Sequence, residues 1–268
     1  GAKDFTRLQQ LYKKRDKAGN YSSIQNCLNM AAIETAITPD VFDSNIYWFH
    51  AQNGALDLSS YKDNTFDGVL YHKPQHYFTK TAGTSFETDE TSKPAQWSEQ
   101  LPYLPYCPKW IQFVMDCCNK DMDLYYYLQK AAGYSILTGD ISEQKVFCLL
   151  GEGRNGKSLF INTLAEIAGD YANKIEASVL CTNRFGDKDN DMSKELYRIK
   201  GSRFVYSNEF GRSSVLNENF IKTITDGGKI ACRPLYGASI EYKPSYTLWF
   251  STNHMPNLAA MDEGIRRR

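Results

Sequence analysis

Apolar residues recur at helical spacing in several stretches of the chain. Residues 4–16 (DFTRLQQLYKKRD) and 22–37 (SSIQNCLNMAAIETAI) place them three and four positions apart, which predicts two N-terminal helices. Residues 109–137 show the same period, with two expected core stripes: Trp110, Phe113, Val114 and Cys117, then Leu124, Tyr127, Leu128 and Ala131. Residues 157–169 predict a further helix that Gly169 ends, with its inward face formed by Leu159, Phe160, Thr163, Leu164 and Ile167.

Three short apolar runs predict strands instead. They are KVFCLL (145–150), RFVYSNEF (203–210) and YTLWFSTN (246–253), and polar or glycine residues follow each apolar run. The order strand, glycine-rich loop, helix and further strands is typical of an α/β fold with a parallel sheet. In such sheets ligands bind at the carboxyl ends of the strands, so the polar residues there are candidates for a site.

Residues 46–60 (IYWFHAQNGALDLSS) predict a β-hairpin, because two short apolar runs flank the dipeptide Asn53-Gly54. We expect these two residues to form the tight turn, in which both take a positive φ. A proline-rich segment at residues 92–108 indicates an extended linker. We therefore expect three parts: a mixed α+β domain, mainly helical, over residues 1–108, a helical connection over 109–144, and an α/β core over 145–268.

Composition and charge describe an ordinary globular chain. Of its 268 residues, 42% are hydrophobic and 23% charged, and the formal net charge is zero. Contact with nucleic acid therefore has to come from a local basic surface. No apolar run is long enough to cross a membrane, and the seven cysteines lack metal-ligand spacing. We expect a cytoplasmic protein with reduced thiols and no membrane partner.

The stretch GEGRNGKS, residues 151–158, fits the pattern of a phosphate-binding loop, G-x-x-x-x-G-K-[ST]. Glycines let the backbone amides wrap around phosphate, and the N-terminus of the following helix adds partial positive charge. Lys157 is expected to reach the β- and γ-phosphates of ATP, and Ser158 to bind Mg²⁺. The expected nucleotide-binding residues are Gly151, Glu152, Gly153, Arg154, Asn155, Gly156, Lys157 and Ser158.

Hydrolysis of ATP also needs an acid, and Glu209 follows the second apolar run. We expect it to act on the attacking water and on Mg²⁺. Asn253, after the third run, carries an amide that both donates and accepts, which suits contact with the γ-phosphate or the water. Arg267 and Arg268 are candidates for the arginine that neutralises charge in the transition state. For each residue the alternative is an ordinary surface or turn position.

The order of these motifs resembles the superfamily 3 helicase domain of phage and plasmid primase-helicases, the group that includes the poxvirus primase-helicase. ELYRIKGSRFVYSNE (195–209) resembles the run into the acid-bearing strand of that family, and TDGGKIACRPLYG (225–237) the signature that follows it. STNHMP (251–256) resembles its sensor motif and DEGIRRR (262–268) its arginine motif. Upstream, NGALDLSS, HYFTK, CPKW and LQKAAGYSILTG resemble its pre-helicase domain, so the likeness covers nearly the whole chain.

The resemblance implies an AAA+-like P-loop ATPase core in a homo-hexameric ring that hydrolyses ATP between subunits and moves along single-stranded DNA. It implies Glu209 as the catalytic acid, Asn253 as the sensor, and Arg267, or less favourably Arg268, as an arginine finger. It also implies a DNA-gripping hairpin and a primase module N-terminal to this region in the full-length protein. The expected DNA contacts, which are basic for phosphate or aromatic for stacking, are Lys222, Lys229, Arg233, Tyr236 and Lys243.

Three functions stay open at this point. The first is the ATP-dependent replicative DNA helicase domain of a viral, phage or mobile-element primase-helicase. The second is a P-loop ATPase that loads or remodels nucleoprotein without unwinding, and it shares every ATP-binding residue with the first. The third is a small-molecule or nucleotide kinase, which needs a lid and an acceptor pocket. The segment TDGGKIACRPLYG between the acid and sensor strands argues against a kinase.

Overall fold

The computed structural model of the chain describes residues 2–60, 68–86, 107–182, 189–208, 210–211, 214–234, 237–258 and 263–268. Its contacts divide the chain into two compact units, residues 1–42 and 43–268. This division differs from the expected boundaries at 108/109 and 144/145, which stay predictions. Most of the proline-rich segment lies outside the described residues.

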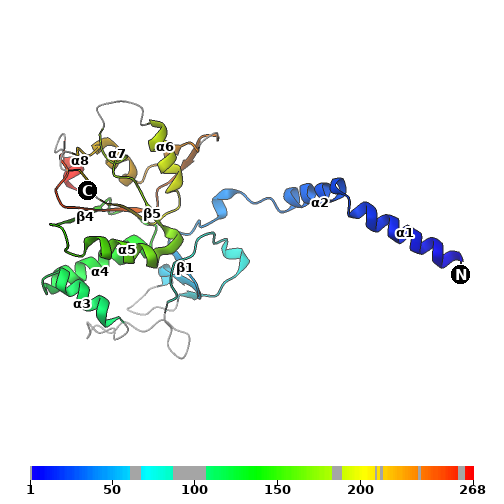
Figure 1. The fold of residues 1–268 in the computed structure, drawn as a ribbon, viewed down its shortest axis with the longest axis horizontal. Helices are drawn as coiled ribbons and strands as arrows, with labels where there is room; N and C mark the ends of the chain where they lie inside the picture. Colours follow the sequence, from blue (N-terminus) through cyan, green and yellow to red (C-terminus); the bar gives the residue numbers. More distant parts are fainter. Residues whose placement is uncertain are drawn as a thin grey trace. The chain divides into compact units, whose positions relative to one another are not determined.

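The first unit is helical, as the periodicity of its apolar residues predicted. It contains α1 (Ala2–Ala18), α2 (Tyr21–Glu34) and the short 3₁₀ helix η1 (Pro39–Val41) (Figure 1). Asn20 caps α2, because its Oδ1 accepts a hydrogen bond from the backbone N of Ser23 at 2.9 Å. No residue of α2 is buried, so capping and intrinsic helix propensity stabilise it within this unit rather than a core.

The second unit opens with a small antiparallel sheet of β1 (Trp48–Ala51), β2 (Gly54–Asp57) and β3 (Val69–Leu70). The hairpin is confirmed, but its predicted turn was wrong by one residue. Gly54 pairs with Ala51 inside the ladder, so Gln52 and Asn53 form the turn. Of the expected turn dipeptide only Gly54 has a positive φ, of 151°. The Asn53 side chain is held instead by two hydrogen bonds to the backbone of Phe86.

Four parallel strands form the central sheet, in the order β4-β9-β6-β5. They are β4 (Val146–Leu150), β5 (Ala172–Lys174), β6 (Phe204–Asn208) and β9 (Thr247–Thr252). Helices α3 (Pro108–Cys117), α4 (Met122–Leu137) and α5 (Lys157–Ala168) lie on one side of the sheet, and α6 (Asp189–Arg198) and α7 (Glu218–Thr225) on the other (Figure 1). The predicted mixed α/β fold with a parallel sheet is therefore confirmed.

The remaining short elements connect these strands and helices, except α8, which follows β9. They are η2 (Leu58–Ser60), η3 (Pro74–His76), η4 (Gly169–Tyr171), β7 (Ile230–Cys232), β8 (Ile240–Tyr242) and α8 (Glu263–Arg266). None of the helices within the described ranges is long and apolar enough to span a membrane. All seven cysteines lie within those ranges and are free thiols.

Alternate residues of the central strands build a hydrophobic core on each face of the sheet. Phe204 and Trp249 belong to the core shared with α4 and α5, whereas Val205 and Leu248 belong to the core shared with α7. All six residues of β9 are buried, as its place between β4 and β6 requires. Trp249 is completely buried and its Nε1 donates to Ser135 Oγ at 2.8 Å, which joins the sheet to α4.

Three of the predicted helix faces were partly wrong. On α3, Cys117 was expected in the core stripe but is exposed, and Cys118 is buried instead. α5 ends at Gly169 as expected, but it buries Phe160, Ile161, Leu164 and Ala168. Leu159 and Ile167, expected inside, are 57% and 37% exposed. On α4, Leu124 and Tyr127 are also exposed, at 42% and 56%. The buried stripe is rotated because each helix packs against both the sheet and a neighbouring helix, which periodicity alone does not specify.

Candidate functional site

The glycine-rich loop, residues 151–156, connects the end of β4 to the start of α5. Gly151 N donates to Thr252 O at 3.3 Å, so the loop begins beside the end of β9. Gly156 precedes the first residue of α5 and has a φ of 83°. A Cβ at Gly156 would lie 2.8 Å from Phe113 Cε2 and 2.9 Å from Cys117 Sγ. Helix α3 therefore supports the loop at close range, and only glycine fits there.

The ammonium group of Lys157 is surrounded by oxygen atoms. Its Nζ donates to the carbonyl oxygens of Gly151 at 2.6 Å and Glu152 at 3.2 Å, and to Asn155 Oδ1 at 2.8 Å. It also donates to Asn253 Oδ1 at 3.2 Å, across 96 positions of sequence. The last contact exists because β4 and β9 are neighbours whose carboxyl ends coincide, with Leu150 opposite Thr252. The predicted lysine and the predicted sensor asparagine therefore meet.

The loop and the end of β9 line a cavity of about 220 Å³. Its walls are residues 153–159, from the loop and the first turn of α5, and residues 251–253. Ser251 Oγ donates to Asn208 Oδ1 at 3.3 Å, which joins the ends of β9 and β6 beside the cavity. Glu209 follows Asn208 directly but lies outside the described residues, so its roles as catalytic acid and Mg²⁺ ligand stay predictions.

The chemistry of this cavity suits a polyphosphate. Arg154 and Lys157 supply positive charge, and the first turn of α5 carries backbone N–H groups that have no acceptor within the helix. Partial desolvation, and then the charge of Asp116, raise the pKa of the Cys117 thiol beside the loop. No group of three His, Cys, Asp or Glu side chains among the described residues forms a metal-binding cluster.

The two candidate finger arginines lie at the other end of β4 from the glycine-rich loop. The carbonyl oxygen of Arg267 accepts from Lys145 Nζ at 2.5 Å, and that of Arg268 accepts from Val146 N at 2.9 Å, so both flank the start of β4. The Arg267 side chain is exposed. The Arg268 side chain is only 4% exposed and is bonded within its own subunit to Thr225, Asp226 and Gly264.

The predicted DNA contacts gather around the antiparallel pair β7–β8. Lys229 and Lys243 are exposed and flank the pair Ile230–Tyr242, so they lie at the same end of this hairpin. Arg233 follows β7, and its Nε donates to Gly237 O at 2.8 Å. Lys222 is half-buried on α7, and Tyr236 lies outside the described residues. The structure thus brings Lys229 and Lys243 together and leaves the DNA contact itself a prediction.

Sequence reasoning missed the supports of the site. Phe113 and Cys117 were expected only as core residues, yet they contact the position of Gly156. Thr225 was not expected to bind an arginine, yet its Oγ1 accepts from Arg268 Nε. No local spacing in the sequence indicates either contact, because each contact joins segments more than 35 residues apart.

Two family models match the chain. Residues 2–119 match the model described as "D5 N terminal like", and residues 149–268 match the model described as "Family of unknown function (DUF5906)". The second match contains every candidate residue for nucleotide binding and catalysis.

Curated relatives of the chain are viral proteins. It is 32% identical over 132 residues to "Putative helicase L207/L206" of Acanthamoeba polyphaga mimivirus, which covers 49% of this chain and 14% of the relative. It is 27% identical over 134 residues to "Putative helicase V13" of Sputnik virophage, covering 49% and 17%. It is 25% identical over 228 residues to "Putative primase C962R" of African swine fever virus (isolate Tick/Malawi/Lil 20-1/1983), covering 84% and 22%. The matched regions span less than a quarter of these relatives.

Solved structures similar to the chain include the apo structure of NrS-1 C terminal region, with a TM-score of 0.45 and 16% identity over 81% of this chain and 56% of that one. An A form apo structure of the same region has a TM-score of 0.44 and 14% identity, over 80% and 55%. The two family models match separate parts of the chain, and its viral relatives are named putative helicases or primases.

Proposed function

We propose that this chain is the ATPase core of a superfamily 3 DNA helicase, in which ATP hydrolysis between the subunits of an AAA+-like hexameric ring drives movement along single-stranded DNA. The observation that carries the proposal is the 3.2 Å contact between Lys157 Nζ and Asn253 Oδ1 beside the loop cavity. A loop lysine next to an amide at the end of the neighbouring parallel strand suits hydrolysis of a nucleoside triphosphate.

The residues of the cavity fit ATP and Mg²⁺. A Cβ on Gly151 would lie 2.1 Å from Asn155 Nδ2, so the backbone stays bare where phosphate has to approach. Lys157 and Arg154 hold the phosphates, and Asn253 orients the γ-phosphate or the attacking water. The exposed hydroxyl of Ser158 is a ligand for Mg²⁺, which takes few protein ligands and neutralises phosphate charge when bound. Glu209 accepts the proton of the water.

The position of Arg267 supports hydrolysis between subunits. This residue flanks the start of β4, whereas the glycine-rich loop follows the end of the same strand. At about 3.3 Å per residue, the five residues of β4 separate the two by roughly 15 Å. This separation favours contact of the exposed Arg267 with the nucleotide of a neighbouring subunit over contact with its own, and Arg267 is the finger in this proposal.

The β7–β8 hairpin is the proposed contact with DNA. Lys229 and Lys243 lie exposed at its base, and Arg233 is exposed at the end of β7. In a ring of six subunits these cations repeat around the centre, which attracts the phosphates of single-stranded DNA. Lys222 and Tyr236 complete the proposed set, the tyrosine by stacking on a base.

The test compares ATP hydrolysis, with and without single-stranded DNA, in the wild type, Lys157→Ala and Lys130→Ala. Lys130 is an exposed lysine of α4 and controls for the loss of a charge. We expect DNA to raise wild-type and Lys130→Ala turnover, and Lys157→Ala to lose about 10²–10³-fold in kcat, as other donors to a transition state do. Circular dichroism checks that the variants keep the fold.

A mixing experiment tests the arginine. Arg267→Ala should lose activity and partly regain it when mixed with Lys157→Ala, because some mixed interfaces then hold an intact loop and an intact arginine. If an assembled wild-type ring hydrolyses ATP at the same rate with and without single-stranded DNA, that result would contradict the proposal. DNA-stimulated turnover without separation of a forked duplex would favour a remodelling ATPase. Phosphate transfer to a small molecule by a monomer would favour a kinase.

A further inference from the structure

Arg268 binds the point where the chain enters the β7–β8 hairpin. We propose that the ion pair between Arg268 and Asp226 transmits movement of the arginine segment, residues 263–268, to the base of the hairpin. Arg268 is then a positioning residue, which acts through Asp226 and not on ATP. The inference rests on the function proposed above, and it adds the route by which a nucleotide at the subunit boundary affects the grip on DNA.

The guanidinium of Arg268 is fixed in one orientation. Its Nε donates to Thr225 Oγ1 at 2.7 Å, its Nη1 to Gly264 O at 2.6 Å, and its Nη2 to the Asp226 carboxylate. The Arg268 side chain is 4% exposed, whereas that of Asp226 is 57% exposed. A planar group with three nitrogens bonded to three residues holds those residues at set distances from one another.

The two residues of this ion pair lie at functionally distinct places. Thr225 is the last residue of α7 and Asp226 its C-cap, and Gly227, with a φ of 76°, turns the chain toward β7. At the other end, Arg268 directly follows Arg267, and its carbonyl oxygen accepts from Val146 N at the start of β4. Arg268 therefore contacts the start of β4 through its backbone, and the arginine segment and the entrance of the hairpin through its side chain.

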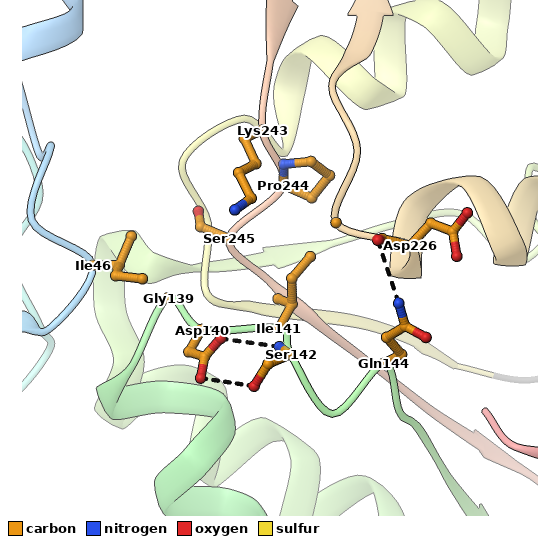
Figure 2. A pocket seen from close by; sticks show the side chains of 11 residues that line it. Ile46, Gly139, Asp140, Ile141, Ser142, Gln144, Asp226, Lys243, Pro244 and Ser245 are labelled. Atoms are coloured by element: carbon orange, nitrogen blue, oxygen red, sulfur yellow. Dashed lines mark hydrogen bonds between the residues drawn. The ribbon is translucent and has the colours of Figure 1, made fainter.

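A cavity of about 290 Å³ lies against the base of the hairpin. Both chain segments at the base line it, Asp226 and Gly227 before β7 and residues 243–245 after β8. Residues 139–142 and Gln144 form another wall (Figure 2). Gln144 Nε2 donates to Asp226 O across one side, at a long 3.4 Å. The base therefore borders open space on this side, whereas Ile230 and Tyr242 pack into the core on the other.

The consequence is a coupled movement. When Arg267 shifts to engage a nucleotide, Arg268 shifts with it as the adjacent residue, and its bonds draw Asp226 and the entrance of β7 along. Asp226 is the best residue for a test, because it takes no part in the proposed ATP site. Its carboxylate also opposes the basic charge of the hairpin, so removing it does not weaken attraction to DNA.

The experiment measures turnover of ATP with and without single-stranded DNA, and the affinity for a fluorescent oligonucleotide, in the full chain. We expect Asp226→Asn to keep the turnover without DNA and to bind DNA at least as tightly. The stimulation by DNA should fall by about tenfold, within the usual range of coupling between two sites. Asp226→Glu keeps the carboxylate and should keep the stimulation. Gln144→Asn, which contacts Asp226 but not Arg268, is the matched control and should behave as the wild type.

Each other outcome overturns the inference. If DNA stimulates Asp226→Asn as strongly as the wild type, the ion pair between Arg268 and Asp226 carries no coupling, and the proposed function still stands. If turnover without DNA and the melting temperature fall together with the stimulation, Asp226 only supports the fold. If DNA does not change ATP turnover in the wild type itself, the proposed function fails and the coupling fails with it.

Discussion

Gly156 is the loop position at which alanine should harm folding most. Its φ is 83°, and a Cβ there would lie 2.8 Å from Phe113 Cε2 and 2.9 Å from Cys117 Sγ. Gly153, in the same loop, offers a matched control, because a Cβ at that position meets no heavy atom of the described residues within 4 Å. The two substitutions add the same methyl group to the same loop and differ only in surroundings and backbone angle.

The expected free-energy change follows from these contacts. A Cβ in the left-handed region costs about 1–2 kcal/mol. Crowding against Phe113 and Cys117 adds about 1–3 kcal/mol. The smaller entropy of the unfolded chain with alanine offsets about 0.4–1 kcal/mol. The net loss of stability is about 3 kcal/mol for Gly156→Ala, which is roughly 10 °C of Tm for a chain of this size. Gly153→Ala avoids both penalties.

Thermal unfolding followed by circular dichroism checks this difference. Gly156→Ala should melt roughly 10 °C below the wild type, and Gly153→Ala within about 2 °C of it. Replacing the ring in the double variant Gly156→Ala/Phe113→Leu should recover part of the loss, because the side chain nearest the new methyl group is then smaller. Equal melting temperatures for the two single variants would refute the steric argument.

Two further predictions concern a buried arginine and a half-buried thiol. Arg203 is 5% exposed and donates to the carbonyl oxygens of Leu137 and Trp48, so Arg203→Gln should cost about 3–5 kcal/mol in urea unfolding, since bonds from a charged group contribute about 1.5–3 kcal/mol each. A loss no larger than that of the exposed Arg15→Gln would contradict this. Burial raises the pKa of the Cys148 thiol to about 11. At pH 8 its reactive thiolate fraction is therefore about a hundredfold smaller than that of a thiol with a pKa of 9.0. Iodoacetamide should therefore label exposed Cys27 much faster, and equal rates by mass spectrometry would oppose the assignment.

Much of the local structure could be predicted from the sequence. The strands at 146–150, 204–208 and 247–252 lie within the three apolar runs, and α5 begins after the glycine-rich loop and ends at Gly169. These features depend on residues that are neighbours in sequence: β-branched and aromatic runs, glycine at a turn, and the helical period. Fine detail failed even here, because the hairpin turn moved to Gln52 and Asn53 once Gly54 joined the ladder.

The candidate site was predictable in its residue types and not in its assembly. The pattern of residues 151–158 singled out Lys157, and the polar end of the third run singled out Asn253. Their contact depends on β9 lying next to β4, although β6 comes between them in the sequence. Periodicity reports which residues face a core and says nothing of which strand pairs with which.

Neighbouring residues in the sequence are enough to predict an α/β core with a phosphate-binding pattern between a strand and a helix. The contact of Lys157 with Asn253 and the close approach of α3 to Gly156 depend instead on how distant segments pack together. The same folding buries Arg268 against Asp226 while its neighbour Arg267 stays exposed. The two neighbouring residues are both arginines, yet their side chains differ in exposure. Hydrogen-bond partners at the end of α7, more than 40 residues earlier, enclose Arg268 and not Arg267.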